Sequence, residues 1–188
     1  MKKFIMLAAF VLLFSGCSNS LKVTPQEVAD AYEKDFSASA KAVFGERETE
    51  MSVSKNGMSI SITVNSPAEL SGMGIEISDE HAKIGYKGME QEIEKDSLPE
   101  GTPFLLLEEL FEELSDPEDF ALSIENENIV ADFGDFSAVL SSEDFSLISA
   151  EFPFFETKFT FSNFEFVPRN KILKKILKNS CFFCFNAV

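Results

Sequence analysis

The side chains that could perform chemistry are of few kinds: one histidine, three cysteines and 32 carboxylates. A serine-based catalytic triad would have to use His81, and no Gly-x-Ser-x-Gly turn accompanies it. A zinc site needs clustered cysteine and histidine ligands, and the stretch after Cys17 and before Arg169 offers His81 alone. We therefore expect His81 to be an exposed turn residue, and the protein to be no enzyme and to hold no metal or cofactor.

The carboxylates are too abundant for their spacing to single out a catalytic pair of the glycosidase kind. The densest run, Asp116-Pro117-Glu118-Asp119, lacks the spacing and central glycine of a calcium-binding EF-hand loop. We interpret this run as the boundary of a helix.

Cys17 is the one cysteine whose surroundings indicate a definite reaction. Lys2 and Lys3 precede an apolar run, Phe4–Phe14, which is about half of the ~20 residues needed to cross a bilayer. Ser15-Gly16 then leads to Cys17. This is the order of a secretory signal, and it resembles the bacterial lipobox, whose cysteine takes a diacylglyceryl group and becomes the new N-terminus. Phe14 departs from that pattern, where leucine is usual.

Two acyl chains on one cysteine hold a protein stably, whereas a single chain attaches only marginally. We therefore expect the protein to be anchored by lipid at the extracytoplasmic face of a bacterial cell membrane. The expected organisation is a signal peptide over residues 1–16, a lipidated tether over 17–23, a domain over 24–168 and a separate tail over 169–188.

The tail differs in kind from the rest of the chain. It holds five basic residues and no acidic one, and Cys181 and Cys184 are spaced as Cys-x-x-Cys. Three interpretations stay open: a basic amphipathic membrane anchor, a redox or disulfide pair, and a tail without selected function. The apolar and basic positions of its expected helix are Ile172, Leu173, Ile176 and Leu177, and Lys171, Lys174, Lys175 and Lys178.

The expected domain is strongly acidic. All 32 acidic residues and only nine basic ones lie after Cys17 and before Pro168, so this stretch has a net charge of −23. Such a surface repels nucleic acid and anionic headgroups, so we expect neither to be a ligand of the domain.

Two segments have the pattern of helices. Thr24 and Glu27 are spaced as a capping box around Pro25, and apolar residues then recur at helical spacing as far as Phe44. The second helix is expected over Thr102–Leu114, with Thr102 as its cap and glutamates on its outer face.

The remaining segments favour antiparallel strands. Asn56-Gly57 and Gly134-Asp135 predict two tight hairpins, the second with Phe133 opposite Phe136. Further strands are expected in two sections, and their ranges are 74–77, 82–86 and 89–93, then 145–151, 154–161 and 164–167. This pattern predicts an α+β fold with a curved, mostly antiparallel sheet and two helices covering its concave side.

Phenylalanine is concentrated in the second β section, which holds ten of the 21 in the chain. These rings are interpreted either as a filled core or as the wall of an apolar cavity for acyl chains. The residues expected to line such a cavity are Phe133, Phe136, Phe152, Phe154, Phe159 and Phe161.

The order of these features resembles the LolA/LolB-like fold of lipoprotein carriers, an unclosed antiparallel barrel with helices across its open side. The matching features are Cys17, the segment Pro25–Phe44, the hairpin at Asn56-Gly57, the helix Pro103–Leu114 and the strands of Phe133–Phe166. The resemblance implies a cavity that shelters lipid, or a membrane-tethered partner in envelope assembly. The chain is also similar to small uncharacterised lipoproteins of Gram-positive, clostridia-like bacteria.

The expected function is therefore that of a non-enzymatic envelope lipoprotein that binds a lipid, an acylated ligand or an envelope protein. The alternatives are an acidic protein-interaction module without a ligand cavity, and an envelope hydrolase that uses scattered carboxylates.

Overall fold

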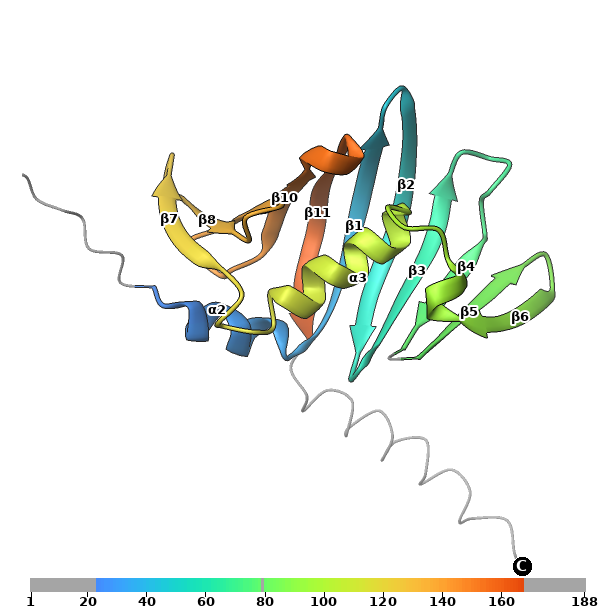
Figure 1. Cartoon of the computed structure of the whole chain (residues 1–188), viewed down its shortest axis with the longest axis horizontal. Helices are drawn as coiled ribbons and strands as arrows, with labels where there is room; N and C mark the ends of the chain where they lie inside the picture. Colours follow the sequence, from blue (N-terminus) through green and yellow to red (C-terminus); the bar gives the residue numbers. More distant parts are fainter. Residues whose placement is uncertain (1–22, 79, 168–188) are drawn as a thin grey trace, which may run out of the picture.

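The computed structural model describes residues 23–78 and 80–167, which form one antiparallel sheet of eleven strands with helices beside it (Figure 1). The strand order across the sheet is β6-β5-β4-β3-β2-β1-β11-β10-β9-β8-β7. The strands are β1 (Asp35–Phe44), β2 (Arg47–Asn56), β3 (Ser59–Ser66), β4 (Gly74–Ile77), β5 (His81–Tyr86), β6 (Met89–Glu94), β7 (Ala121–Glu125), β8 (Asn128–Asp132), β9 (Ser137–Leu140), β10 (Leu147–Phe152) and β11 (Thr157–Val167).

The sheet consists of two meanders that meet where the first strand pairs with the last. Strands β1 to β6 follow one another across one half, and β7 to β11 follow one another across the other. The two halves are connected by the antiparallel pairing of β1 with β11, from Asp35 opposite Val167 to Phe44 opposite Thr157. The first and last strands of the described chain therefore lie next to each other at the centre of the sheet.

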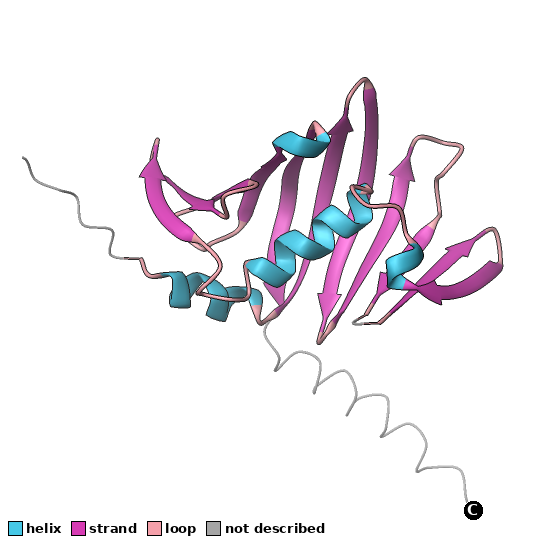
Figure 2. Cartoon of the chain, in the orientation of Figure 1, coloured by secondary structure: helices cyan, strands magenta, loops and turns pink. Residues whose placement is uncertain are grey.

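Helix α3 (Pro103–Glu113) is placed by this topology. Strands β6 and β7 are the two edges of the sheet, so their connection must pass across the whole of one face (Figure 1). Figure 2 shows α3 and the short 3-10 helix η2 (Lys95–Ser97) in this connection. The buried side of α3 packs against the strands in one hydrophobic core, and its residues are Leu106, Leu107, Leu110, Phe111 and, at the C-cap, Leu114.

The α+β class, the unclosed antiparallel sheet and the two predicted helical segments are confirmed, but the extent of the first helix is wrong. Helix α2 covers only Pro25–Tyr32, and its predicted capping box of Thr24 and Glu27 is present. It lies at the margin of the sheet near the start of β1 (Figure 1). The Thr102 side chain, expected to cap α3, makes no capping hydrogen bond.

The segment predicted as the rest of the first helix is strand β1. Phe36, Ala38, Ala40 and Ala42 are buried while the residues between them are more exposed, which is the period of two of a strand. Strands β2 and β11 pair with β1 on its two sides and satisfy its backbone groups. Alanine has a high helix propensity, but these long-range hydrogen bonds outweigh that local preference.

The two hairpins have the predicted inward faces. Between β8 and β9, Gly134 has a φ of +90°, and Ala131 lies opposite Ala138, which is the register that the predicted pairing of Phe133 with Phe136 requires. In the β2–β3 hairpin the turn residues are Gly57 and Met58 instead of Asn56 and Gly57, so Val53 lies opposite Ile62. A turn at Asn56 and Gly57 would place Val53 opposite Ile60, so the pairing partner differs by two residues and the same face stays buried.

The second β section differs from its prediction in two respects. Strand β7 at the sheet edge was not predicted, and β11 is one continuous strand where two were expected. Phe154 lies in the 3-10 turn Pro153–Phe155 (η3), which connects β10 to β11. Within residues 23–167, no helix is both long enough and apolar enough to span a membrane.

Candidate ligand cleft beside helix α3

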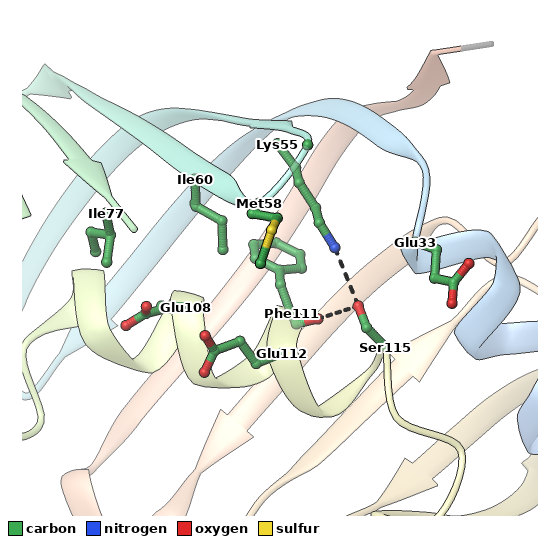
Figure 3. A pocket seen from close by; sticks show the side chains of 10 residues that line it. Glu33, Lys55, Met58, Ile60, Ile77, Glu108, Phe111, Glu112 and Ser115 are labelled. Carbon is green, nitrogen blue, oxygen red and sulfur yellow. Dashed lines mark hydrogen bonds between the residues drawn. The ribbon is translucent and has the colours of Figure 1, made fainter. Parts of the chain in front are cut away.

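A cleft of about 410 Å³ lies between α3, the β2–β3 turn, β4 and the end of α2 (Figure 3). Its apolar lining comes from Met58, Ile60, Ile77 and Phe111. Its polar lining comes from Gly57, Glu33, Lys55, Glu108, Glu112 and Ser115. The cleft is therefore amphipathic, with contributions from both helices and three strands or their turns.

Among the residues that the structure describes, Lys55 is the only basic one that lines the cleft. Its Nζ donates to the backbone oxygen of Tyr32 at 2.7 Å and to Ser115 Oγ at 3.3 Å. Ser115 Oγ in turn donates to the backbone oxygen of Phe111 at 2.7 Å. Tyr32 ends α2 and Phe111 lies in the last turn of α3, so both carbonyls lack a partner within their own helix. Lys55 contacts the first directly and the second through Ser115, and its charge opposes the negative dipole ends of both helices. Burial lowers the pKa of Lys55, although Glu33, Asp35 and Glu112 partly oppose that effect.

We expect Lys55→Met to lower the free energy of unfolding by about 1–3 kcal/mol, because it leaves the Tyr32 carbonyl without its charged donor. Chemical denaturation measures this change. Lys158→Met is the matched control, since Lys158 forms an exposed ion pair with Glu151 and should cost at most about 0.5 kcal/mol. Equal effects of the two substitutions would contradict the bridging role of Lys55.

The carboxylates of the cleft fall into two groups. Glu108 is buried and forms an ion pair of 2.8 Å with Lys95. Glu33 and Glu112 are exposed, and within the described part of the chain neither forms an ion pair. The rim of the cleft therefore carries two exposed carboxylates above an apolar floor, and Lys55 is the one cationic side chain among the described residues that line it.

The six phenylalanines predicted to line a cavity do not gather in this cleft. Phe136, Phe152 and Phe159 are buried in the core that α3 shares, and Phe133 and Phe161 are partly buried against it. Their rings form a continuous series in which Phe136 stacks on Phe133 at 4.3 Å and on Phe152 at 4.4 Å between ring centroids. Phe154 is 86% exposed in its turn. Their role as a ligand surface stays a prediction.

The residues that the sequence analysis considered for catalysis, metal binding or lipidation lie outside the cleft or outside the described residues. His81 begins β5 and is exposed, 4.0 Å from Glu92. In the run at Asp116, the Glu118 backbone N–H donates to Asp116 Oδ1 at 3.0 Å just beyond the end of α3. No cluster of three metal-ligating side chains occurs among the residues the structure describes. Cys17, Cys181 and Cys184 lie outside those residues.

The cleft residues were not identified from the sequence, although one signal was present. Met51 and Val53 point inward from β2, and the same period of two places Lys55 on the inward side. A lysine at a core-facing position of a strand indicates either a buried polar partner for its ammonium group or a binding site that it lines. The contributions of Glu33 and Glu112 had no comparable local signal.

No protein-family model and no curated protein matches this chain. Among solved structures, an uncharacterised conserved protein from Thermus thermophilus is 10% identical, with a TM-score of 0.49, and the match covers 79% of this chain and 88% of that one. A LolA superfamily protein from Nitrosomonas europaea is 10% identical, with a TM-score of 0.38, covering 80% and 97%. An outer membrane lipoprotein-sorting protein domain from Vibrio parahaemolyticus is 12% identical, with a TM-score of 0.43, covering 82% and 97%.

Two of these structures belong by name to the group that the sequence resembles. The unclosed antiparallel sheet crossed by a helix is the architecture which that resemblance implies. At 10–12% identity and TM-scores below 0.5, the likenesses transfer no residue, ligand or partner to this chain. The Gram-positive, clostridia-like origin stays a prediction.

Proposed function

We propose that this protein is a non-enzymatic lipoprotein of the bacterial envelope that binds an apolar or acylated segment with basic groups in the cleft beside α3. The observation that carries the proposal is the cleft itself, because its apolar floor lies below the exposed carboxylates of Glu33 and Glu112. An acyl chain or apolar side chains fit the floor, and lysine or arginine groups complement the rim. Such a ligand is a lipidated envelope protein or a basic segment of one.

The membrane anchor is the second part of the proposal, and it rests on the sequence around Cys17. Cells that express the full chain are grown with labelled palmitate. We expect label on the native chain and none on Cys17→Ser, because the serine hydroxyl does not replace the thiol that accepts the lipid. Equal labelling of both chains would place the lipid elsewhere.

The ligand is tested with a fluorescent peptide that carries four lysines and one palmitoyl chain. We expect Glu112→Lys to weaken its binding about tenfold, because the change reverses a charge at the rim. All chains in this test also carry Lys171→Gln, Lys174→Gln, Lys175→Gln and Lys178→Gln, so that the basic tail does not compete with the peptide. Glu125→Lys makes the same charge change on β7, away from the cleft, and should alter the Kd less than about twofold. Fluorescence anisotropy gives both constants. A Kd that does not differ between the two variants would refute the cleft as the site.

A second candidate function is an acidic interaction module, and the outer side of α3 favours it. Burial raises the pKa of Glu109, and Asp135 and Glu112 raise it further. The pKa of Glu113 is raised by burial and then by Glu109, Asp119 and Asp135. A basic partner would relieve this repulsion between carboxylates. Binding that needs no acyl chain and is lost in high salt would support this candidate instead.

A further inference from the structure

The tail leaves the described domain beside the cleft. Val167 ends β11 and pairs with Asp35, which places their Cα atoms about 5 Å apart. Asp35 Oδ1 accepts a 2.8 Å hydrogen bond from the backbone N–H of Gly57, which lines the cleft. Glu33, on the rim, is two residues before Asp35. Four further residues of extended chain span about 13 Å, so Lys171 can reach the rim.

Charge distinguishes the tail from everything that precedes it. Residues 169–188 hold five basic residues and no acidic one, whereas the stretch after Cys17 and before Pro168 has a net charge of −23. The rim of the cleft carries Glu33 and Glu112 without ion pairs among the described residues. Lys55 already compensates the C-terminal ends of α2 and α3, so the attraction for the tail rests on Glu33 and Glu112.

The apolar pattern of the tail also matches the cleft. Ile172, Leu173, Ile176 and Leu177 have the spacing of one helical face, and lysines border it. The cleft offers Ile60, Ile77 and Phe111 as a floor. Met58, at the lip of the cleft, is 79% exposed and adds a further apolar surface.

We propose that residues 169–188 dock in cis on the cleft beside α3, with lysines at Glu33 and Glu112 and apolar side chains on the floor. The inference rests on the proposed function, since it uses the same site. A short connection gives the tail an effective concentration of about 1 mM, so an intrinsic Kd of about 0.1 mM fills the cleft to roughly 90%. The tail is then an internal competitor that an external ligand must displace.

The test measures oxidation of Met58 by dilute hydrogen peroxide in the full chain, with mass spectrometry of the sulfoxide. Met89, which is 70% exposed and lies on β6 away from the cleft, is the internal reference. We expect Met58 to react at least threefold more slowly than Met89 in the native chain. In the variant Lys171→Glu, Lys174→Glu, Lys175→Glu and Lys178→Glu, the two rates should come within twofold of each other.

Reversal of the rim charges provides the matched test. Glu33→Lys with Glu112→Lys should remove the protection of Met58, and combining it with the four tail substitutions should restore it. The control pair Glu125→Lys with Glu143→Lys makes the same charge change at exposed positions elsewhere and should leave the protection unchanged. Equal rates at Met58 and Met89 in the native chain would overturn the inference. Protection that appears only with vesicles of phosphatidylglycerol would overturn it in favour of a membrane contact.

Failure of this inference can be told apart from failure of the proposed function. The palmitoylated lysine peptide is added to the variant with the reversed tail, in which the cleft is open. If the peptide protects Met58 although the native tail does not, the cleft binds ligands and the cis docking is wrong. If neither the tail nor the peptide protects Met58, both proposals fall.

Discussion

Replacing Phe111 by alanine is expected to lower the free energy of unfolding by about 3–5 kcal/mol. Phe111 is fully buried on α3, with ring centroids 4.6 Å from Phe36, 6.4 Å from Tyr32 and 6.3 Å from Phe161. The substitution removes these contacts and leaves a void where α3 crosses the sheet. For a domain of this size the expected loss in Tm is about 8–15 °C, measured by calorimetry.

The matched control is Phe154→Ala, because Phe154 is the same residue type at an exposed position. It should change stability by no more than about 0.5 kcal/mol. Phe111 also lines the cleft, so the void in Phe111→Ala joins the proposed ligand site. The palmitoylated peptide should then recover part of the lost Tm by filling it. A Phe111→Ala protein as stable as Phe154→Ala would show that α3 does not pack as described.

Gly101→Ala is the second large expected effect, a loss of about 2–5 kcal/mol. Gly101 has a φ of +72°, where a side chain costs about 1–2 kcal/mol. A Cβ there would also lie 2.6 Å from Cε1 of Phe155 and nearer still to its Cδ1. Overpacking of this kind costs about 1–3 kcal/mol. The contact matters because it joins the start of α3 to the turn between β10 and β11.

Gly72→Ala separates the two contributions. Gly72 has a φ of +83°, but no atom lies within 4 Å of the place a Cβ would take, so only the conformational cost of about 1–2 kcal/mol applies. The double variant Gly101→Ala with Phe155→Ala should recover the steric part, as a double-mutant cycle in chemical denaturation would measure. If the two glycine variants lose the same stability, the close approach of Phe155 contributes nothing.

The sequence was sufficient where the controlling interactions are local. The capping box of Thr24 and Glu27 spans three residues, and the turn at Gly134 needs only a glycine that tolerates positive φ between two apolar runs. The apolar face of α3 follows from residues three and four apart. The acidic charge of the domain follows directly from composition, and the secretory signal before Cys17 stays a prediction from residue order.

Only the tertiary structure decided whether residues 35–44 form a helix or a strand, and which residues make up the cleft. The alanines of β1 satisfy a helical or an alternating pattern equally, and strands β2 and β11, the second more than 110 residues away, select the strand. The cleft joins Glu33, Lys55, Met58 and Glu112 from separate elements because β1 pairs with β11 and α3 must cross the sheet between its two edges. Such contacts depend on which distant backbone groups pair, and short-range spacing in the sequence carries no information on that choice.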